Sequence, residues 1–142
     1  VFEWGCGMST VWFERRGCEV YGVEDSVVWY ERVRRRVTRA QLWLLEGAAY
    51  VDKIREFPPG YFGLISVDGS QRLACSRAAL EHASPGTMVL VDNTDNDRTT
   101  GGELFVIDAM IEQLGPDWRV HRVPGFGPCN FFAWETTVCV RR

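Results

Sequence analysis

Polar side chains at the ends of two apolar runs are the residues of this 142-residue chain best suited to chemistry. Asp68 follows the run Tyr61–Val67, and Asp92 and Asn93 follow the run Thr87–Val91. Two carboxylates and an amide oxygen are hard oxygen ligands of the kind that Mg²⁺ prefers. A metal ion held there would lower the pKa of a bound hydroxyl and orient it for attack. A second interpretation stays open, in which Asp68 faces a reaction without a metal and Asp92 and Asn93 cap a turn.

A turn with two glycines lies near the start of the chain. The short apolar strand Val1–Trp4 runs into Gly5-Cys6-Gly7 and then into a helix. Glycine tolerates positive φ and lets a ligand lie against bare backbone, and the start of the helix directs free N–H groups at the same place. The third glycine of the dinucleotide fingerprint is absent, because Ser9 stands two positions after Gly7. This absence disfavours a nicotinamide or flavin cofactor.

Acidic and hydroxyl residues surround this turn. Glu3 comes directly before it, and Ser9 or Thr10 is predicted to cap the helix that follows. Glu24 and Asp25 follow the second predicted strand, about 20 positions beyond the turn, where a bound nucleoside presents its ribose hydroxyls. Glu24 is therefore the predicted ribose ligand. The alternative is a carboxylate that only favours the start of the next helix through the helix dipole.

The order of elements positions these residues. Apolar runs alternate with helical segments, and continuous apolar runs are typical of strands that are buried on both faces of a parallel sheet. The sequence predicts an α/β fold with a doubly wound, mostly parallel seven-stranded sheet, an antiparallel C-terminal strand and helices on both faces. Because the carboxyl ends of parallel strands meet at one edge, the glycine turn, Asp68 and Asp92 are expected to converge.

The expected element bounds follow from the apolar periods and from glycine and proline positions. Loops are expected at Asp95–Gly102, with a mobile character, and at Pro124–Pro128. The predicted strands are Val1–Trp4, Cys18–Val23, Gln41–Leu45, Tyr61–Val67, Thr87–Val91, Trp118–Val123 and Asn130–Val140, and the predicted helices are Ser9–Arg16, Val27–Ala40, Tyr50–Phe57, Arg72–His82 and one that carries Leu104, Ile107, Ile111 and Leu114 on one stripe.

The opening Glu3-x-Gly5-x-Gly7 resembles the first motif of class I S-adenosylmethionine-dependent methyltransferases, which have a Rossmann-like fold. The resemblance implies that this turn holds the amino acid end of the cofactor and that the turn at Gly47 and Ala48 lies at the adenine ring. The cofactor-binding residues expected in this way are Glu3, Gly5, Cys6, Gly7, Ser9, Thr10, Glu24, Asp25, Gly47, Ala48 and Asp68.

Two branches of that class share further motifs with the chain. Val67-Asp68 and Val91-Asp92-Asn93-Thr94 resemble the metal-binding motifs of catechol and caffeoyl-coenzyme A O-methyltransferases. The glycine-turn opening, Val-Asp-Gly with a later arginine and cysteine, and Asp-Asn-Thr resemble bacterial methyltransferases of undefined substrate. The resemblance implies Asp68 and Asp92 as catalytic residues, and Asp68, Asp92 and Asn93 as ligands of Mg²⁺ if a metal is used.

The general base of the catechol type is missing from its expected place. Three residues beyond Asp68, where that type has a lysine, this chain has Gln71, and Arg72 follows. Neither accepts a proton near neutral pH, arginine because its pKa is above about 12. His82 and His121 titrate near neutral pH, but their places at the far end of a helix and in a late strand predict structural roles.

We therefore expect transfer of a methyl group from S-adenosylmethionine to a small-molecule acceptor, with oxygen as the favoured acceptor atom and Mg²⁺ assistance left open. One rival is a non-catalytic or remnant Rossmann-like domain that serves as a binding module. A less favoured rival is a nicotinamide-dependent oxidoreductase. The acceptor and the oligomeric state stay open.

Length, composition and charge indicate which broad class of protein this is. The length predicts one domain over residues 1–142, and 46% hydrophobic with 25% charged residues is typical of a soluble globular protein. The net charge of −3 disfavours a nucleic-acid partner, and no apolar run approaches the roughly 20 residues of a membrane span. Five cysteines without a Cys-x-x-Cys pair predict reduced thiols in the cytoplasm. The chain begins on an apolar strand without Met, which leaves open an upstream helix that would close the pocket.

Overall fold

The computed structural model describes residues 1–95, 102–126 and 133–142. Strands and helices alternate as far as the fifth strand, and two long strands end the chain. The strands are β1 (Phe2–Trp4), β2 (Tyr21–Glu24), β3 (Gln41–Leu44), β4 (Leu64–Val67), β5 (Met88–Val91), β6 (Trp118–Phe126) and β7 (Ala133–Arg141). The helices are α1 (Met8–Arg15), α2 (Val27–Arg34), α3 (Gly47–Asp52), α4 (Arg72–His82) and α5 (Glu103–Glu112), with a 3-10 turn, Lys53–Glu56, after α3.

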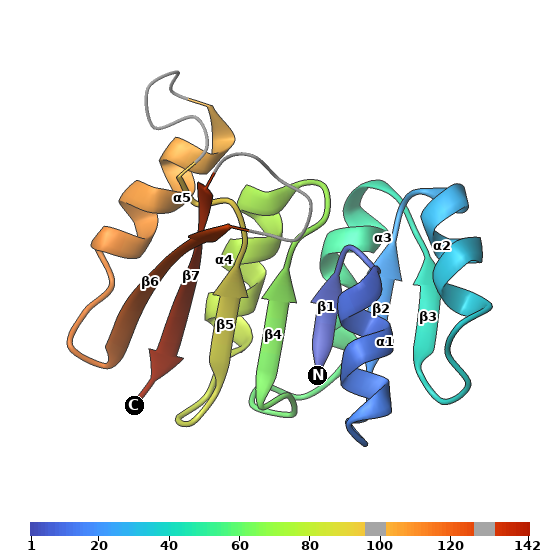
Figure 1. Ribbon diagram of the computed structural model, residues 1–142. Helices are drawn as coiled ribbons and strands as arrows, with labels where there is room; N and C mark the ends of the chain where they lie inside the picture. Colours follow the sequence, from blue (N-terminus) through green and yellow to red (C-terminus); the bar gives the residue numbers. More distant parts are fainter. Residues whose placement is uncertain (96–101, 127–132) are drawn as a thin grey trace.

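All the strands belong to one sheet, whose order is β3-β2-β1-β4-β5-β7-β6 (Figure 1). The strands β1 to β5 pair in parallel, and β7 is antiparallel to both β5 and β6. The chain order reverses at β1, which pairs with β2 on one side and with β4 on the other. The predicted doubly wound sheet with an antiparallel end is therefore confirmed.

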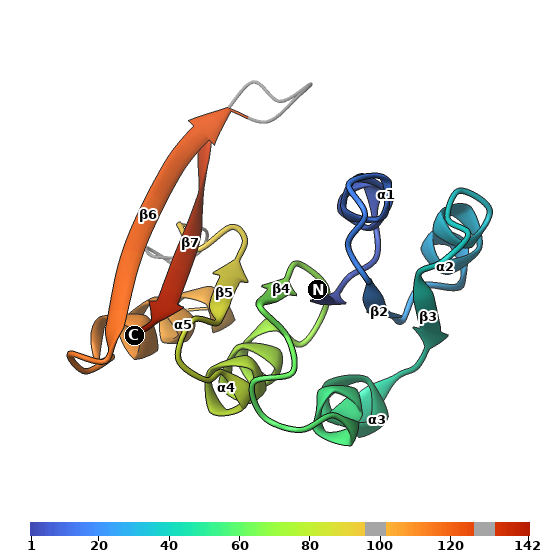
Figure 2. The same ribbon diagram turned by 90° about the horizontal axis from the view of Figure 1, so that it is seen from below.

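Helices cover both faces of the sheet. Figure 2 shows α1 and α2 on one face and α3, α4 and α5 on the other. Successive strand residues point to opposite faces, so Phe2 and Trp4 pack in the large core beneath α3 to α5, while Glu3 points towards α1. Cys6, Val11 and Val33 form a smaller core. The glycine turn is thus held between two packed layers.

The helix α2 ends at Arg34 rather than at the predicted Ala40. The reason is Glu14, whose carboxylate accepts the backbone N–H groups of Thr38, Arg39 and Ala40 at 3.0, 2.7 and 2.6 Å. These N–H groups would donate to carbonyls of the preceding turn if the helix continued. Glu14 comes from α1 and is only 7% exposed, so a contact between distant segments overrides the local helical pattern.

Other boundaries also differ from expectation. The helix α3 begins at Gly47 rather than at Tyr50, and β2 begins at Tyr21 rather than at Cys18. The strand β6 continues through Pro124 to Phe126, where a loop is predicted, because an edge strand tolerates a proline that cannot donate to a neighbour. Most of the predicted loop Asp95–Gly102, and residues 127 and 128 of the other, lie outside the described residues.

Two predictions made from the composition, on membrane spans and on cysteines, can be compared with the described residues. No helix within the described ranges is long and apolar enough to cross a membrane. Within the described ranges, the four cysteines Cys6, Cys18, Cys75 and Cys139 form no disulfide bond.

Candidate functional site

A cavity of about 500 Å³ lies at the carboxyl ends of β1, β2 and β4. Small-molecule sites have volumes of roughly 300–1,000 Å³. The cavity forms where the order of the sheet reverses, which is the usual ligand crevice of a doubly wound sheet. Its lining residues are Gly5, Cys6, Gly7, Met8, Glu24, Asp25, Ser26, Trp29, Asp68, Gly69 and Ser70.

The two glycines of the β1 turn occupy their positions for different geometric reasons. Gly5 has a φ of +89°, and a Cβ placed on it would lie 2.6 Å from the Cα of Gly69. The turns after β1 and β4 therefore touch backbone to backbone, which only glycine permits. A Cβ on Gly7 would meet nothing nearer than the Ser9 hydroxyl, at 4.0 Å. Gly7 thus leaves open space beside the cavity rather than a packed contact.

The start of α1 differs from the predicted cap. The helix begins at Met8, and Gly7 is its N-cap, so neither Ser9 nor Thr10 holds that position. The Thr10 hydroxyl instead accepts the Gly7 N–H at 3.0 Å and donates to the Glu3 carboxylate at 2.5 Å. The difference arises because the helix starts at Met8, one residue before the predicted start at Ser9. Thr10 becomes the link between the turn and the strand beneath it.

Glu3 is a buried acid directly below the glycine turn. Its side chain is 1% exposed, and burial raises its pKa to about 7. Its Oε1 atom has no hydrogen-bond partner among the described residues, although the Ser9 hydroxyl lies near enough to lower the pKa somewhat. A buried carboxylate oxygen without a donor is costly. Among the described residues, the unpartnered oxygen of Glu3 therefore lacks a donor directly beneath the glycine turn, which itself lines the cavity.

Glu24 joins the ends of two strands. Its two carboxylate oxygens accept the N–H groups of Cys6 and Ser26, at 2.7 and 2.8 Å. Burial raises the pKa of Glu24. The neighbouring Asp25 accepts a hydrogen bond from the Ser70 hydroxyl of the β4 turn. These contacts place acidic oxygens from β2 across the cavity from the glycine turn.

Asp68, Asp92 and Asn93 gather around the side chain of Arg72, the first residue of α4. The guanidinium donates to Asp68 Oδ1 and to Asn93 Oδ1, both at 2.9 Å. Asp92 Oδ1 accepts from the Thr136 hydroxyl. Burial, followed by the nearby Asp92 carboxylate, raises the pKa of Asp68 to about 6. Within the described residues, no three His, Cys, Asp or Glu side chains are grouped to hold a metal ion.

The structure brings together part of the predicted site. Gly5, Cys6, Gly7, Glu24, Asp25 and Asp68 line the cavity. Glu3 and Thr10 lie buried beneath it. These positions agree with the predicted convergence of the strand ends, and the binding role of each residue stays a prediction.

Other predicted residues lie outside the lining. Ser9 is exposed on α1, and Gly47 and Ala48 are exposed at the start of α3. Gly47 still lies near the β4 turn, because its carbonyl accepts a hydrogen bond from the Gln71 side chain at 3.3 Å. Within the described part of the chain, Asp92 and Asn93 connect to the cavity through Arg72 and Asp68.

Several lining residues are absent from the sequence prediction. Gly69 and Ser70 follow Asp68 directly, and Ser26 follows Asp25, so a wider window around each strand end could have found them. Met8 and Trp29 carry no such signal, because helix periodicity does not say which exposed residue turns towards a cavity. Arg72 does not line the cavity, and the arginine of the Val-Asp-Gly motif was its signal in the sequence, but its hydrogen bonds to both strand ends are visible only in the structure.

The two histidines lie away from the cavity. His82 is buried at the end of α4, beside the Phe62 ring, and burial lowers its pKa. His121 is exposed on β6. The structural roles of the two histidines stay predictions.

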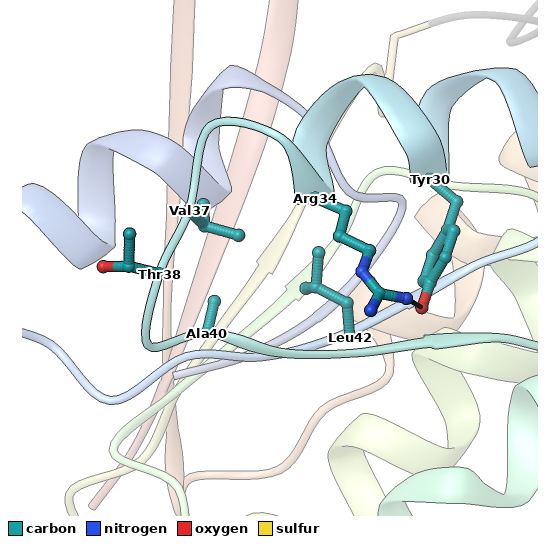
Figure 3. Close-up of a pocket in the computed structure, with 6 residues that line it drawn as sticks. All are labelled: Tyr30, Arg34, Val37, Thr38, Ala40 and Leu42. Carbon is teal, nitrogen blue, oxygen red and sulfur yellow. Dashed lines mark hydrogen bonds between the residues drawn. The ribbon is translucent and has the colours of Figure 1, made fainter.

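A second hollow, of about 310 Å³, lies beside α2 and the edge strand β3. The guanidinium of Arg34 donates to the Tyr30 hydroxyl at 3.3 Å there (Figure 3). None of the predicted site residues lines this hollow. Its lining residues are Tyr30, Arg34, Val37, Thr38, Ala40 and Leu42.

Comparison with known proteins identifies similar folds. No protein-family model and no curated protein matches the chain. Among solved structures, an O-methyltransferase from Bacillus cereus in complex with SAH matches with a TM-score of 0.81 and 20% identity, over 99% of this chain and 73% of that one. The O-methyltransferase TomG from Streptomyces achromogenes, involved in tomaymycin synthesis and solved with SAM, matches with a TM-score of 0.78 and 16% identity, over 99% and 71%.

A third match extends the range of acceptors found on this fold. An rRNA methylase from Streptococcus thermophilus matches with a TM-score of 0.71 and 12% identity, over 99% of this chain and 86% of that one. The chain thus has the Rossmann-like fold of class I methyltransferases, as the sequence resemblance predicts. At these identities the likeness concerns the fold.

Proposed function

We propose that the protein transfers a methyl group from S-adenosylmethionine to a small-molecule acceptor, with oxygen as the acceptor atom. The observation that carries this proposal is Glu3, a buried carboxylate with one unpartnered oxygen below the glycine turn. The cofactor carries an ammonium group at its amino acid end, which would provide the missing donor. The similar structures solved with SAH and SAM support the same cofactor.

The chain's own groups would hold this cofactor along the edge of the sheet. Glu3 would accept the ammonium, and the backbone of Gly5 and Gly7 would lie against the amino acid portion. Glu24 would accept the ribose hydroxyls, since a carboxylate oxygen that already accepts one N–H retains a further lone pair. Gly47 is proposed at the adenine ring because it lies next to Gln71, at the start of α4.

The bound cofactor supplies a methyl group that its sulfonium already activates. The chain then has to position the acceptor in line and remove a proton. Asp68 lines the cavity with its side chain 50% exposed, so its carboxylate is proposed to face the acceptor. Asp68 and Asn93 accept hydrogen bonds from Arg72, so the cluster does not fit a divalent ion, and no step is assigned to Mg²⁺.

The first test is isothermal titration of the protein with S-adenosylhomocysteine and, separately, with NAD⁺. We expect binding of the first ligand only. Glu24→Ala should weaken binding about tenfold or more, because a hydrogen bond to a charged group contributes roughly 1.5–3 kcal/mol. Glu19→Ala, an exposed carboxylate outside the cavity, is the matched control and should bind as the wild type does. Binding of NAD⁺ instead would contradict the proposal.

A binding module without catalysis is the second candidate. Gln71 stands where the catechol type has its base, and its side chain donates to Gly47. The module would bind S-adenosylhomocysteine with the same loss on Glu24→Ala. It would transfer no methyl group to a panel of hydroxylated acceptors, whereas transfer that Asp68→Asn lowers would support the enzyme.

A further inference from the structure

Arg72 uses every N–H group of its guanidinium within the protein. Its Nε donates to the Gly69 carbonyl at 3.0 Å. Its Nη1 donates to the Asp92 carbonyl at 2.7 Å and to Asn93 Oδ1 at 2.9 Å. Its Nη2 donates to Asp68 Oδ1 at 2.9 Å and to the Asp68 carbonyl at 3.3 Å. Because a guanidinium has five N–H donors, none is left for a substrate.

The oxygens that Arg72 contacts include two of those that a divalent ion would need. Mg²⁺ requires oxygen ligands at about 2.0–2.1 Å in octahedral geometry. Asp68 Oδ1 and Asn93 Oδ1 already face the guanidinium, and Asp92 Oδ1 accepts from the Thr136 hydroxyl. A dication among these oxygens would lie within a few ångströms of a permanent positive charge, which repels it. The guanidinium and the metal ion therefore exclude one another.

The residue before Arg72 and a residue that accepts a hydrogen bond from its side chain both have an uncommon backbone conformation. Gln71, which precedes it, has a φ of +50°, and Asn93, which accepts from it, has a φ of +57°. They are the two non-glycine residues with positive φ in the described chain. Residues other than glycine rarely adopt such a conformation, although asparagine does so more often than most. It persists where surrounding contacts enforce it. Both residues therefore lie next to the same guanidinium, which joins the turns after β4 and β5.

We propose that Arg72 takes the place of the divalent cation and that the methyl transfer proposed above needs no metal. Its side chain joins the turn after β4 to the turn after β5 and neutralises Asp68. Because it has no free N–H group, Arg72 is a positioning residue that acts through Asp68 and Asn93. The exclusion of the cation is independent of the proposed methyl transfer, whereas the metal-free reaction rests on it.

The test is a titration of the full chain with Mn²⁺, in which electron paramagnetic resonance counts free and bound ion. We expect the wild type to bind no Mn²⁺ at this cluster. Arg72→Gln removes the charge and leaves the acidic oxygens. This variant should therefore bind Mn²⁺ with an affinity at least about tenfold above the upper limit measured for the wild type. Asp92→Asn in the Arg72→Gln background should abolish the gained site. Arg77→Gln, an exposed arginine of the same helix, is the matched control.

Arg72→Lys separates charge from packing. Lysine keeps the positive charge but offers only three donors, so the variant should remain without Mn²⁺ even if it is less stable. A merely structural role for Arg72 would make Gln and Lys behave alike. If Arg72→Gln does not fold, Arg72→Met removes the charge with a side chain that packs more readily.

Two results would overturn the proposal. One is binding of Mn²⁺ by the wild type that Asp92→Asn removes. The other is the absence of binding in both the wild type and the folded charge-free variant, because the guanidinium would then not be what excludes the ion. Titration of each variant with S-adenosylhomocysteine, read separately, shows whether the proposed cofactor site has failed instead.

Discussion

At the scale of single residues, Glu3 is the most informative side chain. It points from β1 towards α1 and is held by one hydrogen bond from Thr10. Its second oxygen lacks a donor among the described residues, and burial raises its pKa to about 7. Near neutral pH, Glu3 in the folded protein without cofactor therefore binds a proton that the same side chain would lose in the unfolded chain.

A Glu3→Gln variant is expected to change how stability depends on pH. Because the pKa of Glu3 is raised on folding, its contribution to stability is full below the unfolded value of 4.5 and is lost as the pH rises through about 7. A rise from 4.5 to about 7 corresponds to about 3 kcal/mol. The free energy of unfolding is measured by urea unfolding at about pH 5.5 and at about pH 8. From the lower to the higher pH it should fall less in Glu3→Gln than in the wild type.

The control for this prediction is the exposed Glu19→Gln, which should keep the wild-type slope. An unchanged slope in Glu3→Gln would show that Glu3 is already ionised at neutral pH. Saturation with S-adenosylhomocysteine should reduce the slope of the wild type, since its ammonium would favour the ionised carboxylate.

At the scale of elements, the turn between β1 and α1 does two separate things. Gly5 lets the turn touch the turn after β4, and Gly7 leaves space beside the cavity. The Thr10 hydroxyl accepts the Gly7 N–H, which fixes the first turn of α1 over Glu3. This short segment therefore packs against the turn after β4 and also keeps space open beside the cavity.

Alanine at each glycine should separate these two effects. Gly5→Ala brings a Cβ to 2.6 Å from Gly69 at a φ of +89°, so it should lower the free energy of unfolding by about 1–3 kcal/mol or more. Gly7→Ala has a φ of −154° and open space, so it should unfold like the wild type. Its Cβ should nevertheless weaken S-adenosylhomocysteine binding, measured by titration calorimetry. Equal stability of the two variants would contradict this account of the turn.

At the scale of the whole molecule, the larger of the two cores joins elements from both ends of the chain. The large cluster includes Phe2 from β1, Ile65 from β4, Ile107 from α5 and Cys139 from β7. Segments at the two ends of the sequence therefore share the same buried surface. Because both cores pack against the same sheet, the chain is expected to unfold as one cooperative unit.

Unfolding monitored by far-ultraviolet circular dichroism and by tryptophan fluorescence should give coincident curves. Ile65→Ala should lower both midpoints together and reduce the free energy of unfolding by about 2–5 kcal/mol, because Ile65 is fully buried. Val28→Ala, an exposed site on α2, is the control and should change little. Two separate transitions would show that residues 1–142 do not form the single domain that their length predicts.

The sequence by itself determined the doubly wound class of the sheet and the edge at which the cavity lies. Apolar runs, glycine turns and the polar residues that end the strands are local signals, and the rules of parallel sheets bring strand ends together. Gly5, Gly7, Glu24 and Asp68 were accessible to prediction for that reason. Each stands at the end of an element, where position along the chain sets position in space.

Only the tertiary structure decided the partners of the charged side chains. Glu14 ends α2 early through residues more than 20 positions away, and Arg72 reaches Asn93 across a similar gap. Burial, which gives Glu3 its raised pKa, likewise depends on the layer that covers it. Hydrogen bonds of this kind depend on atoms within about 3 Å, and no periodic pattern in the sequence encodes distances between segments that meet only in the fold.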